Sequence, residues 1–200
     1  MKTLVIYVHP VEGSFNSCVR DLVVEYLSKH DHEVRLRDLY AENFDPFLSA
    51  NERALHHTPP TTRPELARDV EDLRWCDAIV FIYPTWWSGL PAQLKGWLER
   101  VFVLGVAFRF NDSGKIRPNL QNIQHIIGVS TYGSPWRYVK LINDNGRRTL
   151  TRAIRMSTGL RTRTMWCGIY ALDTCTQQQR EKFIAETAQK IVKRLEKSSL

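Results

Sequence analysis

Residues 84–89, Pro-Thr-Trp-Trp-Ser-Gly, join two adjacent indoles to hydroxyl groups and a glycine. The indole rings offer flat apolar surface on which a planar ligand could stack, and glycine lets such a ligand approach the backbone closely. The alternative is that Trp86 and Trp87 only close the hydrophobic core. Residue types favour the two interpretations equally, so the surrounding elements have to decide between them.

The second candidate is the loop His9-Pro-Val-Glu-Gly-Ser-Phe-Asn16, between a predicted strand at 3–8 and a predicted helix at 17–29. Free N–H groups and the dipole at a helix N-terminus favour a phosphate or pyrophosphate, and Ser14, Asn16 and His9 could add donors. The alternative is that Asn16 only caps the helix and His9 is a surface residue, which for His9 alone is the better interpretation. There is no GxGxxG or Walker sequence, which disfavours a Rossmann dinucleotide fold or a P-loop NTPase.

Buried strands have to position these loops. The apolar run Ala78–Tyr83 predicts a strand buried on both faces, and Pro84 ends it because proline cannot donate to a β-ladder. An amphipathic helix follows from Pro91. A third loop, Ser130–Tyr138, combines hydroxyl groups and aromatics at the end of another strand. In an open α/β sheet, such loops gather at the carboxyl ends of the strands, where ligands bind.

The rest of the chain repeats the same alternation. Alternating polarity predicts a strand nearer the sheet edge at 33–39, another buried strand is predicted at 123–130, and the last strand is predicted at 162–170. Helices are predicted at 51–57, 64–74, 147–156 and 177–196, and a small hairpin around 109–115. These elements predict one domain over residues 1–200, a doubly wound five-stranded parallel sheet with helices on both faces.

Composition narrows the class of protein. Four scattered cysteines without a CxxC pair favour a reducing, cytoplasmic location over a disulfide scaffold or a zinc ribbon. No metal site is expected, since His56 and His57 would diverge in a helix. No run is apolar enough for membrane insertion, and no signal peptide is recognisable. The net charge of +7 fits a cleft for anionic phosphates or a solvated basic surface, and no aromatic-interleaved basic strand face predicts nucleic-acid binding.

Several motifs together resemble one family. They are His9-Pro with Ser14-Phe-Asn16; Asp38-Leu-Tyr with Asn43-Phe-Asp-Pro46; Pro84, Trp87, Gly89, Pro91-Ala, Leu94-Lys-Gly-Trp97 and Glu99-Arg-Val-Phe102; Gly105 with Ala107-Phe108; and Thr131, Gly133-Ser134 and Tyr138. The chain is similar to the flavodoxin-like NAD(P)H:quinone oxidoreductases, which include mammalian and bacterial quinone reductases and potassium-efflux ancillary proteins. The last 60 residues match only in the order of strands and helices.

The resemblance implies a bound flavin, FAD as first choice and FMN as second. His9, Ser14, Phe15 and Asn16 would hold its pyrophosphate and ribityl end. The isoalloxazine would be lined on one side by Pro84, Thr85, Trp86, Trp87 and Ser88, and on the other by Thr131, Tyr132 and Gly133. Tyr138 falls where the family has a catalytic tyrosine near flavin N1 and O2, where negative charge develops when N5 accepts a hydride.

Three positions depart from the family pattern. Tyr132 replaces one of two paired glycines, so that a close backbone approach is lost or the side chain covers the ring. Asp144 stands where the mammalian enzymes have a histidine that assists the tyrosine, which puts the two-residue proton relay in question. Ser88 replaces an aromatic and would widen the acceptor pocket.

The resemblance implies an NAD(P)H dehydrogenase (quinone)-like enzyme that passes a hydride from NAD(P)H through the flavin to a quinone or similar planar acceptor. The long excursion 40–63 favours FAD, since it offers protein to cover an adenine. A homodimer is also implied, with Trp136 and Phe108 as candidate interface or core residues. The alternatives are a regulatory flavoprotein subunit of a membrane transporter and a one-electron carrier like flavodoxin, which the basic charge disfavours.

Overall fold

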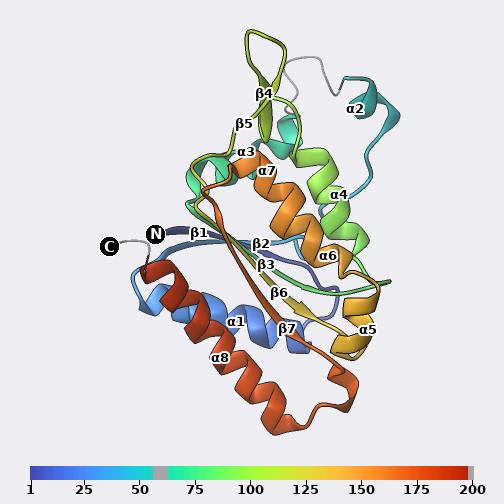
Figure 1. Cartoon of the computed structure of the whole chain (residues 1–200), viewed down its shortest axis with the longest axis vertical. Helices are drawn as coiled ribbons and strands as arrows, with labels where there is room; N and C mark the ends of the chain where they lie inside the picture. Colours follow the sequence, from blue (N-terminus) through green and yellow to red (C-terminus); the bar gives the residue numbers. More distant parts are fainter. Residues whose placement is uncertain (56–62, 198–200) are drawn as a thin grey trace.

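A computed structural model describes residues 1–55 and 63–197 of the chain. Its central sheet has five parallel strands in the order β2-β1-β3-β6-β7 (Figure 1). The strands are β1 Lys2–Tyr7, β2 Glu33–Asp38, β3 Ala78–Pro84, β6 His125–Thr131 and β7 Arg163–Ile169. The predicted fold class is confirmed. The predicted edge position of β2 is confirmed as well.

Helices cover both faces of the sheet (Figure 1). On one face lie α1 Phe15–Lys29 and α8 Gln177–Glu196, which pack on each other. On the other lie α3 Ala67–Trp75, α4 Ala92–Val101, and a continuous helical segment that begins at α6 Asn145–Arg148. This segment continues through η2 Thr149–Ile154 into α7 Arg155–Thr158, and η2 is a π-helix.

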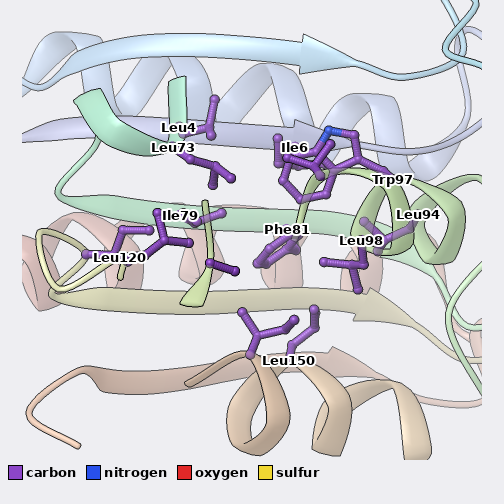
Figure 2. Packing of buried hydrophobic residues seen from close by; sticks show 14 of the residues in the cluster. Leu4, Ile6, Leu73, Ile79, Phe81, Leu94, Trp97, Leu98, Leu120 and Leu150 are labelled. Carbon is purple, nitrogen blue, oxygen red and sulfur yellow. The ribbon is translucent and has the colours of Figure 1, made fainter. Parts of the chain in front are cut away.

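Two hydrophobic clusters fill the layers because each strand points alternate side chains to opposite faces. Leu4, Ile6, Ile79 and Phe81 belong to the cluster that also contains Leu73 of α3 and Trp97 of α4 (Figure 2). Their sequence neighbours, such as Val5 and Val80, face α1 and α8 on the other side. Every residue of β3 and β6 is buried, which confirms the prediction that apolar runs mark strands covered on both faces.

The smaller elements lie outside the sheet. The predicted hairpin forms from β4 Phe108–Phe110 and β5 Ile116–Pro118, and α5 Trp136–Leu141 was not predicted. The remaining short helices are α2 Ala50–Ala54, η1 Pro64–Leu66 and η3 Leu172–Thr174. Residues 56 and 57 of the predicted helix 51–57, with both adjacent histidines, lie outside the described residues. The prediction that Pro84 ends its strand is confirmed, since it is the last residue of β3, paired in register with Thr131.

The excursion that follows β2 is held against α4 at a glycine. A Cβ on Gly96 would lie 2.2 Å from the carbonyl oxygen of Pro46 and 2.4 Å from its Cβ. Only a residue without a side chain allows this approach. The Gln93 side chain, one turn earlier, donates to the carbonyl groups of Leu39 and Phe44. These contacts dock the start of the excursion on the helix that leads away from the candidate site.

Candidate active site

The order of the strands reverses between β1 and β3, because the chain adds β2 on one side of β1 and β6 and β7 on the other. In doubly wound sheets, the crevice outside the carboxyl ends of the strands at such a point is the usual ligand site. The loops that follow β1, β3 and β6 all begin at this edge. They are the three loops that the sequence singled out.

The loop after β1 delivers the N-terminus of α1 to this crevice. Ser14 caps the helix: its hydroxyl accepts a hydrogen bond from the Ser17 N–H at 3.2 Å, so the proposal that Asn16 is the cap was wrong. Phe15 and Asn16 are the first two residues of α1, and N–H groups at these positions have no acceptor within a helix. With the helix dipole, they favour an anionic group in front of the helix.

Asn16 instead connects two loops. It is buried, and its amide nitrogen donates to the Thr131 hydroxyl at 3.2 Å. Its amide oxygen is also buried and has no hydrogen-bond partner among the described residues. Buried polar atoms without a partner are uncommon in proteins. This atom is therefore available to a donor group on a ligand.

The loop after β3 is a tight turn with an unusual backbone. The Gly89 N–H donates to the Trp86 carbonyl at 3.0 Å, and Trp87 and Ser88 between them have φ values of 47° and 60°. Two successive left-handed residues define a type I′ turn, which glycine and asparagine adopt far more readily than tryptophan. The turn leaves the Trp87 side chain fully exposed and Trp86 partly exposed, 6.1 Å from the His9 ring. The interpretation that both tryptophans only close the core was wrong.

Hydrogen bonds fasten this turn to the loop after β6. The Thr85 N–H donates to the Thr131 carbonyl, and the Thr85 and Ser130 hydroxyl groups are 2.8 Å apart. The ends of β3 and β6 therefore hold the two loops in fixed relative positions. A Cβ on Gly133 would lie 3.3 Å from a carboxylate oxygen of Asp173 in η3, the short helix that follows β7.

Tyr132 is directed into the protein. Its ring is buried, stacks on Tyr170 with centroids 4.6 Å apart, and sends its hydroxyl group to Asp144, at 3.0 and 3.2 Å from the two carboxylate oxygens. Burial is the main cause that raises the pKa of Tyr132, and the Asp144 charge adds to it. The phenol is therefore neutral and donates to Asp144, a residue held at a positive φ of 44°. The tyrosine that hydrogen-bonds to Asp144 is thus Tyr132, and not Tyr138.

Two adjoining pockets lie at this edge of the sheet. The first has a volume of about 370 Å³ and the second about 290 Å³, and both are lined by Thr85 and Gly133. The first is also lined by predicted residues His9, Ser14, Phe15, Asn16, Pro84, Trp86 and Thr131. The second is lined by predicted residues Trp87, Ser88, Tyr132 and Tyr138. The structure thus brings all 13 predicted site residues together, while their roles stay predictions.

Sequence reasoning missed part of the lining. Leu172 and Asp173 close the first pocket, and Val139 and Ile142 contribute apolar surface to the second. The first two follow β7, whose carboxyl end lies at the same edge as those of β1, β3 and β6, so the predicted topology contained the signal. Val139 and Ile142 belong to the region of α5, which was not predicted.

Fold and site together define a flavodoxin-like α/β protein with a ligand crevice at its topological switch point. Comparison with known families agrees: the model of a family described as having a flavodoxin-like fold matches residues 1–195. The chain belongs to this family.

The chain is also similar to individual proteins in sequence and in structure. NAD(P)H dehydrogenase [quinone] 1 of Rattus norvegicus is 31% identical over 153 residues, which cover 68% of this chain and 56% of the rat protein. The chain therefore spans little more than half the length of that relative. The crystal structure of Smu.1420 from Streptococcus mutans superposes with a TM-score of 0.83 at 29% identity, covering 97% of this chain and all of the other.

A second similar structure shares the fold at low sequence identity. It is an FMN-dependent NADH-azoreductase from Bacillus anthracis in complex with FMN, with a TM-score of 0.76 and 12% identity, covering 97% of this chain and 98% of that one.

Proposed function

We propose that the protein is a flavin-dependent NAD(P)H oxidoreductase that passes a hydride from NAD(P)H to a quinone or a similar planar acceptor. The observation that carries this proposal is the pair of adjoining pockets. One lies at a helix N-terminus, suited to phosphate, and the other is a cleft walled by aromatic side chains, suited to a planar ring. A flavin joins these two chemical parts in one molecule, and the names of the rat and Bacillus relatives agree with such an activity.

The residues present fit a flavin. Ser14, Phe15 and Asn16 would hold its phosphate end through the helix amides, and the unpartnered Asn16 oxygen would accept from a ribityl hydroxyl. His9 would close this end of the pocket. When bound, a flavin supplies the reversible acceptance of a hydride, chemistry that no protein side chain provides.

The chain's own residues would shape the ring site. Pro84, Thr85 and Trp86 would line one edge of the ring, and Thr131 and Gly133 the other, with Trp87 and Ser88 at the mouth and buried Tyr132 behind them. Tyr138 lies half-exposed in α5 and lines the same pocket. We expect its hydroxyl group to donate a hydrogen bond where negative charge develops.

FAD is the first form of flavin to test and FMN the second. The described part of the 40–63 excursion docks on α4, and within the described residues none of it lines either pocket. An adenine would therefore rely on other residues, including those of a second subunit. The mass of the compound released by heat would identify the flavin directly.

A homodimer and a cytoplasmic location are also part of the proposal, with one domain over residues 1–200. Trp136 is half-exposed beside the site and is suited to an interface, whereas Phe108 packs against the core. Among residues 1–55 and 63–197, no helix combines the length and hydrophobicity needed to cross a membrane. Light scattering on the protein as it elutes from a size-exclusion column would measure the number of subunits.

The first experiment is an absorbance spectrum of the purified protein. We expect flavin bands that bleach on addition of NADPH or NADH and return on addition of a quinone, and mass analysis of the heat-released compound would distinguish FAD from FMN. A colourless protein that also fails to bind added flavin would leave the fold intact and overturn the enzymatic proposal.

The role of Tyr138 has its own test. Tyr138→Phe should slow reduction of the bound flavin by NAD(P)H in rapid mixing about a hundredfold, while the flavin content is unchanged. Unaltered rates would remove Tyr138 from the mechanism.

A further inference from the structure

One short segment carries the net charge of the whole protein. Residues 136–163 contain eight lysines and arginines and one acidic residue, Asp144. The remainder of the chain contains 20 basic and 20 acidic residues, so the net charge of +7 belongs to this segment alone. The segment runs from α5 through α6, η2 and α7 to the start of β7. A charge concentrated in this way produces a strong local field.

Part of this charge surrounds a groove beside the ring site. The groove has a volume of about 340 Å³ and shares two lining residues, Val139 and Asp144, with the pocket of Trp87 and Tyr138. Its basic lining residues are Lys140, Arg147, Arg148 and Arg152. The two spaces therefore adjoin at these residues, and we expect a ligand in the ring site to be able to reach the groove. This volume suits part of a small molecule.

These basic side chains have not been neutralised by the protein. Across the described ranges 1–55 and 63–197, no carboxylate lies within ion-pair distance of Lys140, Arg147, Arg148 or Arg152. Lys140 lies over the Trp136 ring at 4.9 Å, and Arg147 lies 5.9 Å from the Trp166 ring. The single acid of the segment, Asp144, accepts the Tyr132 hydrogen bond. The groove thus holds positive charge available to a ligand.

The backbone of the groove wall is also unusual. Arg152 lies in η2, a six-residue π-helix, and Arg148 lies directly before it. π-Helical turns are rare and occur frequently at functional sites, because the extra residue in the turn redirects side chains. Both arginines are exposed, one helical turn apart.

We propose that this groove binds the 2′-phosphate of NADPH, so that the enzyme prefers NADPH to NADH. The inference rests on the proposed function, since it assigns the electron donor of the same site. NADPH differs from NADH by one phosphate group, which brings about two negative charges at neutral pH. Guanidinium groups match phosphate in geometry and form paired hydrogen bonds with it, so Arg148 and Arg152 are the residues that read this group. Trp136, at the same wall, offers a ring on which adenine can stack.

The test compares two ligands that lack the reactive nicotinamide. Adenosine 2′,5′-bisphosphate and adenosine 5′-monophosphate are titrated by calorimetry into the purified, flavin-loaded protein at low and moderate salt. We expect the bisphosphate to bind about tenfold more tightly, the value of one or two charged hydrogen bonds, with an advantage that falls as salt rises. Equal binding of the two ligands would overturn the inference.

The variant Arg148→Gln/Arg152→Gln should abolish this tenfold advantage and lower the ratio of kcat/KM for NADPH to that for NADH by a similar factor. The matched control is Arg109→Gln/Arg117→Gln, which removes the same charge from the exposed β4–β5 hairpin, where these residues are paired in register. The control should keep the wild-type ratio. If both double variants lose the advantage equally, the effect is that of net charge, and the groove assignment is wrong.

Failure of the two proposals can be told apart. A protein that oxidises NADH and NADPH equally well keeps the proposed function and loses this inference. A protein that oxidises neither donor loses the proposed function, while its preference for the bisphosphate still reports on the groove. If neither nucleotide binds, the groove has a different partner, such as an acidic protein, and the inference is overturned.

Discussion

Two groups of arginines in this protein have opposite surroundings. Arg37 in β2 and Arg100 in α4 are buried, with 5% and 7% of their surface exposed, and each is surrounded by carboxylates. Arg147, Arg148 and Arg152 in the basic groove are exposed, and the described residues place no carboxylate within ion-pair distance of them.

The buried arginines fasten β2, α3, α4 and the 40–55 excursion to one another. Arg37 lies 2.9 Å from Asp69 of α3 and 2.7 Å from Glu42, and Asp69 also accepts a hydrogen bond from the Trp97 indole at 2.6 Å. Arg100 contacts Glu52 at 2.8 Å, Glu65 at 3.2 Å and the Asp45 carbonyl. Two groups of ion pairs thus hold the 40–55 excursion, one to β2 and α3 and the other to α4, and the Trp97 indole joins α4 to the first group.

The different burial and ion pairing of the two groups indicate different roles for the same type of side chain. A buried ion pair is costly to break, because removal of one partner leaves the other charged in a poorly solvated place. An exposed arginine without a partner contributes almost nothing to stability. Its charge is instead available to a ligand. The first group therefore supports structure, and the second is suited to recognition.

The largest expected effect is the loss of the buried group. Arg100→Met should lower the free energy of unfolding by about 3–5 kcal/mol, because Glu52 is left without its partner. Arg148→Met, the matched change in the basic groove, should alter it by no more than about 0.5 kcal/mol. Urea unfolding of both variants measures the contrast. If both variants lost the same free energy of unfolding, burial and carboxylate partners would not distinguish structural arginines from those of the basic groove.

The next effect tests whether the close packing of Gly96 on Pro46, in addition to the ion pairs of Arg100, holds the excursion on α4. Gly96→Ala should destabilise the protein by about 1–3 kcal/mol, because its Cβ would overlap the Pro46 backbone. Lys95→Ala, at the exposed neighbouring position, is the control and should change little. If thermal unfolding shows the two variants to be alike, the ion pairs of Arg100 alone hold the excursion.

A smaller effect of opposite sign is expected at the ring site. Trp87→Gly should raise the free energy of unfolding by about 1 kcal/mol, because glycine adopts the left-handed backbone at position 87 without strain. The same variant should retain less flavin, since the exposed indole is lost. Stability from urea unfolding and flavin content from absorbance are measured together. A variant that is destabilised and keeps its full flavin content would show that Trp87 serves the fold.

The smallest effect concerns pH. Burial opposes ionisation of Glu52, but hydrogen bonds from Ser49 and Arg100 outweigh it and lower its pKa. Because the folded-state pKa is below the unfolded value of about 4.3, the stability from Glu52 is present above that pH and is lost as the pH falls through the folded pKa. The difference in unfolding free energy between the wild type and Arg100→Met should therefore shrink between pH 6 and pH 3. A difference that is constant over this range would show that Glu52 is not the relevant partner.

Sequence patterns were sufficient for the elements whose signals are local. Helix α8 begins and ends as predicted, at 177 and 196, and the structure shows a capping box between Thr176 and Gln179 at its start. Strands β1, β3 and β6 could be predicted because continuous apolar runs leave few alternatives. Helix α5 was missed because it has six residues, and hydroxyl and aromatic residues in its vicinity also suit a loop.

The features that escaped prediction depend on contacts between distant segments. Arg37 was assigned to an alternating edge strand, where a charged residue is normally solvated, but α3 brings Asp69 and Asp72 over it. Asp144 was considered as a partner of the tyrosine at 138, and its observed partner is Tyr132, because α5 turns the chain back between them. Such pairings follow from the path of the backbone, which residue types alone do not define.

The exposure of Trp87 has a spectroscopic consequence. Of the six tryptophans, Trp87 is fully exposed, whereas Trp97 is fully buried in the core. An indole in water emits at longer wavelength than one in an apolar interior, so Trp87 contributes the red edge of the fluorescence of this protein. Any molecule that covers the turn at 86–89 will shift or quench that emission. The protein thus contains its own optical reporter of occupancy, at the mouth of the candidate site and free of any attached dye.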